Sequence, residues 1–224
     1  MTAPRGADAP PALVVVTAVK ALDTAKSRFA APGDGHREAV PGLVLAMLRD
    51  VLAAALAVPE ITAAYVVSPD PAVRAAAADA GARSVPEPSP GGLNAALSAG
   101  AAAARAEGEV AVLALQPDLP GVSVDELRAF LAAAGGRRAF VPDRAGTGTA
   151  ALFSPAGDAL RPAFGPDSAS AHAGGGALAL AGPWPGLRTD IDTPADLKAP
   201  TALGVHTTAA IAACDPGIAS NSRC

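Results

Sequence analysis

The sequence of 224 residues has few aromatic residues and little charge. Aromatic residues make up 3% of the chain and charged residues 17%, and 17 Lys and Arg against 21 Asp and Glu leave a net charge of −4. This balance argues against a basic surface that neutralises the phosphates of DNA or RNA. We therefore expect no nucleic-acid partner, and any nucleotide that binds is expected to be a small molecule.

Cysteines and long hydrophobic runs are also scarce. The two cysteines, Cys214 and Cys224, lie near the end of the chain, which argues against a disulfide framework or a zinc site and fits a reducing cytoplasm. Arg, Asp, Gly and Pro interrupt the apolar stretches before the roughly 18 residues that a membrane-spanning helix needs. Residues 1–11 contain no apolar core typical of a signal peptide. The sequence therefore predicts a cytoplasmic protein with no membrane partner.

Short apolar runs alternate with alanine-rich stretches of helical length. Residues 12–19 (ALVVVTAV) are rich in β-branched residues, which is typical of a strand buried on both faces of a parallel sheet. Similar runs lie at 61–67, 110–115 and 139–141, and the stretches of helical length at 36–57, 70–80 and 93–107. This alternation predicts right-handed βαβ crossovers and an α/β fold, a three-layer sandwich with a mostly parallel central sheet.

Capping patterns and the strength of the apolar pattern indicate the boundaries. Residues 123–126 (SVDE) form a capping box, and residues 193–196 (TPAD) combine a cap, a proline at the first helical position and an acid at the third. The pattern weakens from about residue 200. The predicted organisation is a flexible leader at 1–11, one domain at 12–199 and a C-terminal tail of unknown role at 200–224.

The segments that follow the predicted strands carry the candidate chemistry, because open α/β sheets bind ligands beyond the carboxyl ends of their strands. Lys20, Lys26 and Arg28 come directly after the first strand. Such a loop can neutralise a polyphosphate, although a solvated basic turn has the same composition. Asn94, which follows the irregular loop 86–92, has the donor and acceptor needed to read a purine edge, or it caps a helix.

Three aspartates are candidate metal ligands. Asp118 lies in a stiff loop between two prolines after the strand at 110–115, and Asp190 and Asp192 stand two residues apart. In an extended segment the last two side chains point to the same face, where their mutual repulsion favours a bound cation. Carboxylate oxygens suit a hard cation such as Mg²⁺. The alternatives are a turn-forming role for Asp118 and a helix-opening role for Asp192.

Two glycine-rich segments, GTGT at 146–149 and FGPDS at 164–168, are candidate anion cradles. Glycine lets the backbone approach a ligand closely, and we expect Ser168 to cap a helix over 168–180 whose free N–H groups attract a phosphate or carboxylate. His172 follows one turn later, with either a structural role or a direct role on substrate. The GTGT segment is alternatively only a surface turn.

Together these segments resemble the guanylyltransferases that act on phosphoenolpyruvate or 2-phospho-L-lactate in the biosynthesis of the deazaflavin coenzyme F-420. The resemblance covers about residues 12–199. It rests on AVKALDTAKSR (18–28), LAMLRDVL (45–52), QPDLP (116–120), FVPDRAGTGTAAL (140–152), FGPDSASAH (164–172) and GPWPGLRTDIDTPADL (182–197). The GPWPGLR and GTGTAAL motifs are most similar to the actinobacterial branch, which uses phosphoenolpyruvate.

This resemblance implies a nucleotide-diphospho-sugar transferase fold like that of the molybdenum-cofactor guanylyltransferases. It also implies transfer of GMP from GTP to phosphoenolpyruvate with release of pyrophosphate, and hand-over of the product to the next enzyme of the pathway. The implied acceptor-binding residues are Thr149, Gly165 and Ser168, and the implied Mg²⁺ ligands are Asp118, Asp190 and Asp192. The expected catalytic residues are Lys20, Lys26 and Asp118, and the expected nucleotide-binding residues are Lys20, Lys26, Arg28 and Asn94.

Three other functions are compatible with the same residues. The same reaction on 2-phospho-L-lactate would differ only in the carbon skeleton of the acceptor. Metal-dependent glycosyltransferases also use a D-x-D pattern such as Asp190-Ile191-Asp192, although they often need a larger acceptor domain. A non-catalytic nucleotide sensor on this scaffold would be expected to lack the carboxylates or the basic loop, and both are present.

Overall fold

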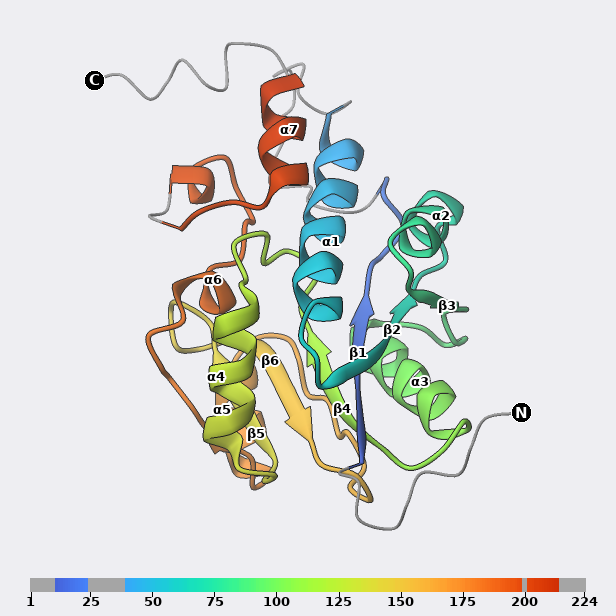
Figure 1. Cartoon of the computed structure of the whole chain (residues 1–224), viewed down its shortest axis with the longest axis vertical. Coiled ribbons are helices and arrows are strands. Elements are labelled where there is room, and N and C mark those ends of the chain that lie inside the picture. The colour runs from blue at the N-terminus through green and yellow to red at the C-terminus, as the bar shows by residue number, and fades with distance from the viewer. Residues whose placement is uncertain (1–10, 24–38, 199–200, 214–224) are drawn as a thin grey trace.

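Strands of the chain pair into a single seven-stranded sheet with the order β3-β2-β1-β4-β6-β5-β7 within the residues described (Figure 1). The structure is a computed structural model that describes residues 11–23, 39–198 and 201–213. The strands are β1 Ala12–Ala18, β2 Ile61–Val67, β3 Arg83–Val85, β4 Val110–Leu115, β5 Ala139–Pro142, β6 Thr149–Ser154 and β7 Leu178–Ala179. Strand β6 is antiparallel to β4 and β5, and the other neighbouring pairs are parallel. The predicted mostly parallel sheet is confirmed.

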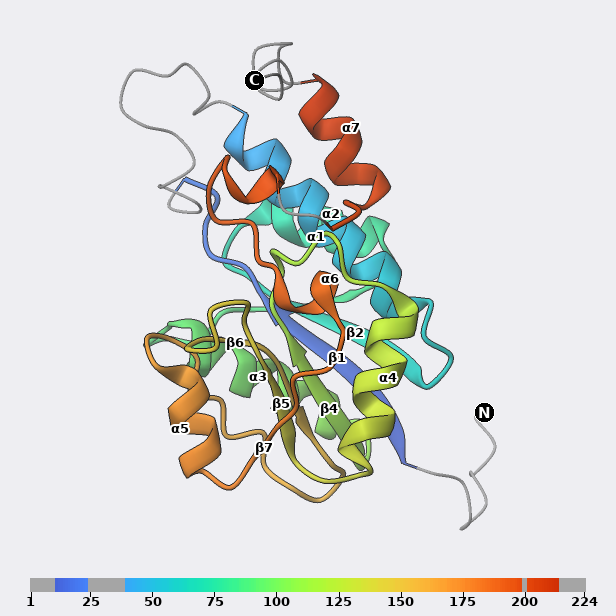
Figure 2. The same ribbon diagram turned by 90° about the vertical axis from the view of Figure 1, so that its left-hand side faces the viewer.

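Helices cover both faces of this sheet and complete three layers (Figure 2). They are α1 Val40–Leu56, α2 Pro71–Asp79, α3 Leu93–Arg105, α4 Val124–Ala134, α5 Ser168–Gly174, α6 Pro185–Arg188 and α7 Val205–Ala213, with the 3-10 helix η2 Asp196–Lys198. Val15 of β1 packs in a core with α1 and α4, whereas Val14 and Val16 pack in a second core with α3 and α5. Successive side chains of a strand point to opposite faces, so β1 serves both cores. In the described part of the chain no helix is long and apolar enough to cross a membrane.

The structure confirms the predicted helix start at Ser123 and differs from the predicted starts at residues 193–196 and at Ser168. The capping box at Ser123 is present, because its hydroxyl accepts the Glu126 N–H and the Glu126 carboxylate accepts the Ser123 N–H. At residues 193–196 no α-helix begins. The Asp196 carboxylate instead accepts the N–H and hydroxyl of Thr193, each at 2.8 Å, and only the short η2 follows.

The predicted helix over 168–180 is wrong at its C-terminal end. Helix α5 ends at Gly174, the first of three consecutive glycines, and Gly176 has a φ of 84°. Glycine adopts this left-handed conformation without steric cost, so the run ends the helix. Asp167 with a φ of 55° is the N-cap, and Ser168 is the first helical residue rather than the cap.

The segment that follows residue 200 packs on the domain. Buried Asp50 of α1 accepts the N–H groups of His206 at 3.0 Å and Thr207 at 2.8 Å, so it caps the first turn of α7 from a neighbouring helix. The Gly204 N–H donates to the Pro120 carbonyl at 2.8 Å. The packed structure therefore continues beyond the predicted boundary at residue 199. The predicted leader lies outside the described residues, except for Pro11.

Replacing Asp50 with alanine is expected to loosen α7 and to lower the free energy of unfolding by about 1–2 kcal/mol, because the first N–H groups of α7 lose their acceptor. Thermal unfolding and amide hydrogen exchange of α7 measure both effects. Asp79→Ala, which removes an exposed aspartate at the end of α2, is the control and is expected to cost less than about 0.5 kcal/mol. Unchanged exchange protection of α7 in the Asp50 variant would contradict this role.

Candidate active site

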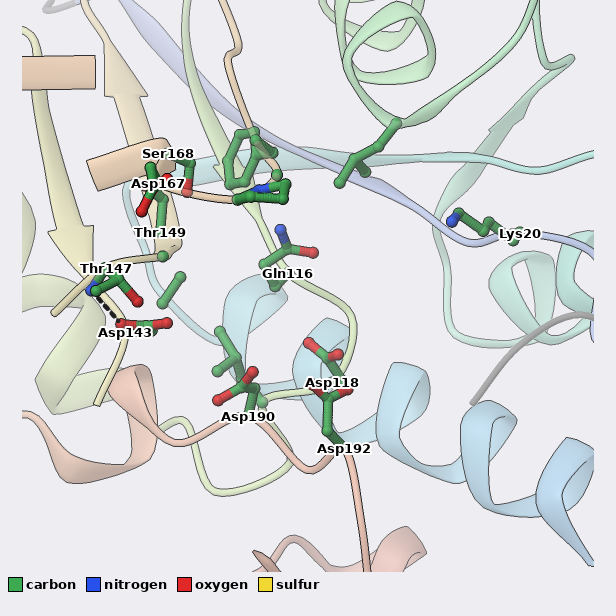
Figure 3. A pocket seen from close by; sticks show the side chains of 17 residues that line it. Lys20, Gln116, Asp118, Asp143, Thr147, Thr149, Asp167, Ser168, Asp190 and Asp192 are labelled. Carbon is green, nitrogen blue, oxygen red and sulfur yellow. Dashed lines mark hydrogen bonds between the residues drawn. The ribbon is translucent and has the colours of Figure 1, made fainter. Parts of the chain in front are cut away.

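A polar pocket of about 720 Å³ opens beyond the carboxyl ends of β1 and β4 (Figure 3). Its walls come from the loops that follow these strands, the turn into β6, the start of α5 and the segment 190–192. The sequence-predicted site residues that line it are Lys20, Asp118, Thr149, Gly165, Ser168, Asp190 and Asp192. Lys26 and Arg28 lie outside the described residues. The fold thus brings together segments that are far apart in the sequence.

The three candidate metal ligands lie on one wall of this pocket (Figure 3). The Ile191 N–H donates to the Asp118 carbonyl at 3.0 Å, which places the two carboxylate-bearing loops side by side. Ile191 itself is fully buried, so Asp190 and Asp192 on either side of it both line the pocket, as their spacing predicts. Their oxygen atoms form a donor set of the kind that hard cations prefer.

These carboxylates fit a cation that completes its coordination with other ligands. Among the described residues, no three His, Cys, Asp or Glu side chains are close enough to hold a metal ion by themselves. Mg²⁺ commonly keeps several water ligands and binds through one or two carboxylates together with substrate phosphates. The donor set fits that mode of binding and does not fit a closed cage made of protein groups.

Lys20 and the Thr149–Ser168 region lie at opposite ends of the pocket, with the carboxylates and Gln116 between them (Figure 3). The Lys20 loop is held to α2 because the Leu22 N–H donates to the Asp70 carboxylate at 3.0 Å. This bond from Leu22, together with the Ala72 N–H, lowers the pKa of Asp70 below its usual value. Lys20 therefore extends from an anchored part of the loop.

The turn between β5 and β6 borders the pocket and depends on Asp143. Its N–H donates to the Gly148 carbonyl at 3.1 Å, and its carboxylate accepts the Thr147 N–H at 3.1 Å. A Cβ at Gly148 would lie 2.3 Å from the Asp143 carboxylate, so the turn requires glycine there. Arg188 of α6 donates to the carbonyl groups of Pro142 and Asp143 at 3.1 and 2.9 Å. The GTGT segment is therefore a braced turn at the pocket edge.

Asp143 and Gln116 line the pocket, and the sequence analysis did not name them as site residues. A signal for Asp143 was present, because an aspartate followed by a glycine-rich stretch is typical of a turn that its side chain closes. A signal for Gln116 was also present, because it directly follows the predicted strand at 110–115, at the edge of the sheet where ligands bind.

Asn94 anchors a loop and is not among the residues that line the pocket. Its Oδ1 accepts the Phe164 N–H at 2.8 Å, and its Nδ2 donates to the Phe164 carbonyl at 2.9 Å. These bonds hold the loop that carries Gly165 against α3. A carboxamide has two donors and two lone pairs, so one of each is left for a nucleotide. The reading of guanine by Asn94 stays a prediction.

His172 lies behind the pocket lining and is buried. Its Nδ1 is 2.9 Å from the Thr149 hydroxyl oxygen, and the Ala163 N–H donates to its Nε2 at 2.9 Å. Burial lowers the pKa of His172, although a hydrogen bond with the Ser168 backbone acts in the opposite direction. The ring is therefore neutral at neutral pH. Both ring nitrogens are hydrogen-bonded to protein groups, which favours a structural role for His172 over direct contact with the substrate.

Comparison with known proteins shows the family of this chain. Residues 15–181 match the model of the MobA-like NTP transferase domain. The chain is 50% identical over 201 residues to the phosphoenolpyruvate guanylyltransferase of Geodermatophilus obscurus, with coverage of 87% of this chain and 92% of the relative. A protein of the same name from Nocardia farcinica is 52% identical over 201 residues, which is 87% of this chain and 88% of that protein. The chain belongs to the phosphoenolpyruvate guanylyltransferase family.

The fold of this family member agrees with a solved structure. A protein named as a nucleotide-diphospho-sugar transferase, from Desulfovibrio desulfuricans G20, superposes with a TM-score of 0.63 over 93% of this chain and 97% of its own. Its sequence is 15% identical, so the likeness concerns the fold alone. The predicted nucleotide-diphospho-sugar transferase fold is confirmed. As a phosphoenolpyruvate guanylyltransferase family member, the chain is a nucleotidyltransferase, a class of enzyme that generally uses a divalent metal ion.

Proposed function

We propose that this enzyme transfers GMP from GTP to phosphoenolpyruvate, giving enolpyruvoyl-diphospho-guanosine and pyrophosphate, in coenzyme F-420 biosynthesis. The single observation that carries the proposal is one pocket with Lys20 at one end, small hydrogen-bonding residues at the other and three carboxylates between them. Relatives that are 50% and 52% identical carry the name of this activity, which favours phosphoenolpyruvate over 2-phospho-L-lactate as the acceptor.

In this reaction a phosphate oxygen of the acceptor attacks the α-phosphorus of GTP in line. The new P–O bond forms as the bond between the α-phosphorus and the bridging oxygen to the β-phosphorus breaks, and pyrophosphate leaves with the electron pair. No general base is needed because the attacking phosphate is already ionised. Catalysis then depends on positioning and on electrostatic stabilisation of the developing charge.

The two ends of the pocket have different tasks in this proposal. Thr149 at the start of β6 and Ser168 at the start of α5 are proposed to hold the acceptor through their hydroxyl groups, and Gly165 through its backbone. Lys20 at the other end is proposed to bind the triphosphate and to stabilise the departing pyrophosphate. The same role is predicted for Lys26, and nucleotide binding is predicted for Arg28. Asn94 is proposed to contact the nucleotide with the donor and lone pair that its bonds to Phe164 leave.

Asp118, Asp190 and Asp192 are proposed to hold Mg²⁺. When bound, the ion neutralises phosphate charge and helps to orient the attacking and leaving oxygens. Ile191 contributes indirectly, since its backbone bond to Asp118 keeps the two loops in register. The cytoplasmic location and the hand-over of product to the next enzyme stay predictions.

Release of pyrophosphate from GTP tests the proposal. Purified protein with Mg²⁺ is given phosphoenolpyruvate, 2-phospho-L-lactate or no acceptor, and downstream enzymes are supplied to consume an unstable product. We expect release with phosphoenolpyruvate. Preference for 2-phospho-L-lactate would overturn the acceptor and keep the reaction. Absence of release with both would overturn the reaction, and release of a nucleoside diphosphate from a sugar nucleotide would then indicate glycosyl transfer.

A further inference from the structure

The hydrogen bonds around His172 have a direction that follows from the groups involved. A backbone amide can only donate, so the Ala163 N–H, 2.9 Å from Nε2, requires that Nε2 accept and carry no hydrogen. A neutral imidazole has one N–H, which must then be on Nδ1. This tautomer is assigned from the hydrogen-bond network, which is the usual basis for such an assignment.

The same argument sets the direction of the next bond. The Nδ1–H donates to the Thr149 hydroxyl oxygen at 2.9 Å, so the hydroxyl hydrogen cannot point back to the ring. Thr149 is 6% exposed and lines the pocket, and within the described residues its hydroxyl has no other hydrogen-bond partner. The hydroxyl hydrogen is therefore available to an acceptor atom in the pocket.

We infer that His172 is a positioning residue that orients the Thr149 hydroxyl as a hydrogen-bond donor to an anionic oxygen of the acceptor substrate. The direction of the hydrogen bonds of His172 follows from the structure alone, and the identity of the substrate that receives the Thr149 hydroxyl hydrogen rests on the proposed function. A donor held in this direction favours an ionised carboxylate or phosphate, because such a group accepts hydrogen bonds and offers none.

The surroundings of His172 hold the ring in one orientation. Its centroid lies 5.7 Å from that of Phe140 and 5.1 Å from that of Phe164. Through its two nitrogens the ring joins β6 at Thr149 to the segment that contains Ala163, and Asn94 holds the adjacent Phe164. Reorientation of the hydroxyl would require these contacts to change together.

Charge around the ring is consistent with a neutral imidazole. Burial and the nearby positive charge of Arg138 both lower the pKa of His172, against the hydrogen bond with the Ser168 backbone. A protonated ring would carry a hydrogen on Nε2 and lose the bond from the Ala163 N–H, with one donor facing another.

Nuclear magnetic resonance of the full chain tests the tautomer without any substrate. The protein is labelled with ¹⁵N-histidine, and the His172 signals are assigned by their loss in His172→Gln, with His206→Gln as a control at an exposed position of α7. We expect nitrogen shifts and ring-proton couplings of the form with hydrogen on Nδ1 at neutral pH. A ring with hydrogen on Nε2, or a charged ring, would overturn the inference.

A double-mutant cycle tests the path through Thr149. His172→Gln can still accept from the Ala163 N–H but lacks a donor at the Nδ1 position, whereas His172→Asn retains a donor there. We expect His172→Gln and Thr149→Val each to raise the KM for phosphoenolpyruvate by about tenfold, with the KM for GTP changed less than about twofold. His172→Asn should retain more of the affinity for the acceptor, and His206→Gln should change neither constant.

The double variant Thr149→Val/His172→Gln should bind phosphoenolpyruvate no more weakly than Thr149→Val alone, since His172 acts through the hydroxyl. Additive losses, or equal loss of affinity for GTP and acceptor, would overturn the inference. If no pyrophosphate is released, the proposed function fails separately, and the same cycle measured as the Kd of phosphoenolpyruvate decides the role of His172.

Discussion

Asp190→Asn is expected to lower kcat for pyrophosphate release by about a thousandfold, and to change the KM for phosphoenolpyruvate much less. The substitution keeps the size of the side chain and removes its charge, so it weakens the hold on a cation at the wall shared with Asp118 and Asp192. Loss of a group that stabilises transition-state charge commonly costs about 10²–10³ in kcat. Steady-state kinetics at saturating GTP and varied acceptor and Mg²⁺ measures the effect.

Asp79→Asn is the matched control, because this aspartate is exposed at the end of α2 and lies outside the pocket lining. It should leave kcat unchanged. Thermal unfolding of the Asp190 variant should resemble that of the unaltered protein, which separates a catalytic loss from a folding defect. Retention of a tenth or more of the normal kcat by Asp190→Asn would remove Asp190 from the proposed metal site.

Gly186→Ala is expected to destabilise the fold by about 3 kcal/mol, at the upper end of the range for overpacking. A Cβ at Gly186 would lie 1.9 Å from the Gly121 carbonyl oxygen and 2.6 Å from the Glu126 carboxylate. The backbone oxygen cannot rotate away, and Glu126 already accepts the Gly186 N–H at 2.8 Å. For a chain of this size the melting temperature should fall by about 6–12 °C in thermal unfolding.

Gly42→Ala is the control for Gly186→Ala and should raise the melting temperature instead of lowering it. Gly42 lies within α1, and a Cβ there would meet no atom within 4 Å. Alanine is a better helix former than glycine by about 0.5–1 kcal/mol. Equal melting temperatures for the two variants would contradict the close approach between α6 and the loop at Gly121.

Much of the fold could be predicted from local patterns. The predicted strands at 61–67 and 110–115 agree with β2 and β4 to the residue, and the predicted helix at 70–80 with α2 to within one residue at each end. Apolar periodicity reports burial directly, and caps and prolines report helix ends. The prediction failed where glycines intervened, since Gly174 to Gly176 ended α5 early. It also omitted β3, β6 and β7; β3 and β7 are only three and two residues long, too short for an apolar run to stand out.

Part of the candidate site could be predicted for a related reason. The carboxyl ends of parallel strands meet at one edge of a sheet, so Lys20 and Asp118, which follow β1 and β4, were expected near each other. The spacing of Asp190 and Asp192 predicted that both side chains face one way. The roles of these residues in binding GTP, acceptor and metal stay predictions.

The sequence alone determined the fold class, the edge of the sheet that holds the pocket and several of the polar residues along it, because these follow from short-range periodicity and from the rules of parallel sheets. Only the tertiary structure decided which distant groups meet. Asn94 bonds Phe164 across 70 positions, and Asp50 caps α7 across 156 and 157 positions. The bonds of His172 to Thr149 and Ala163 likewise depend on packing, since no local pattern encodes a partner that the folded chain brings near.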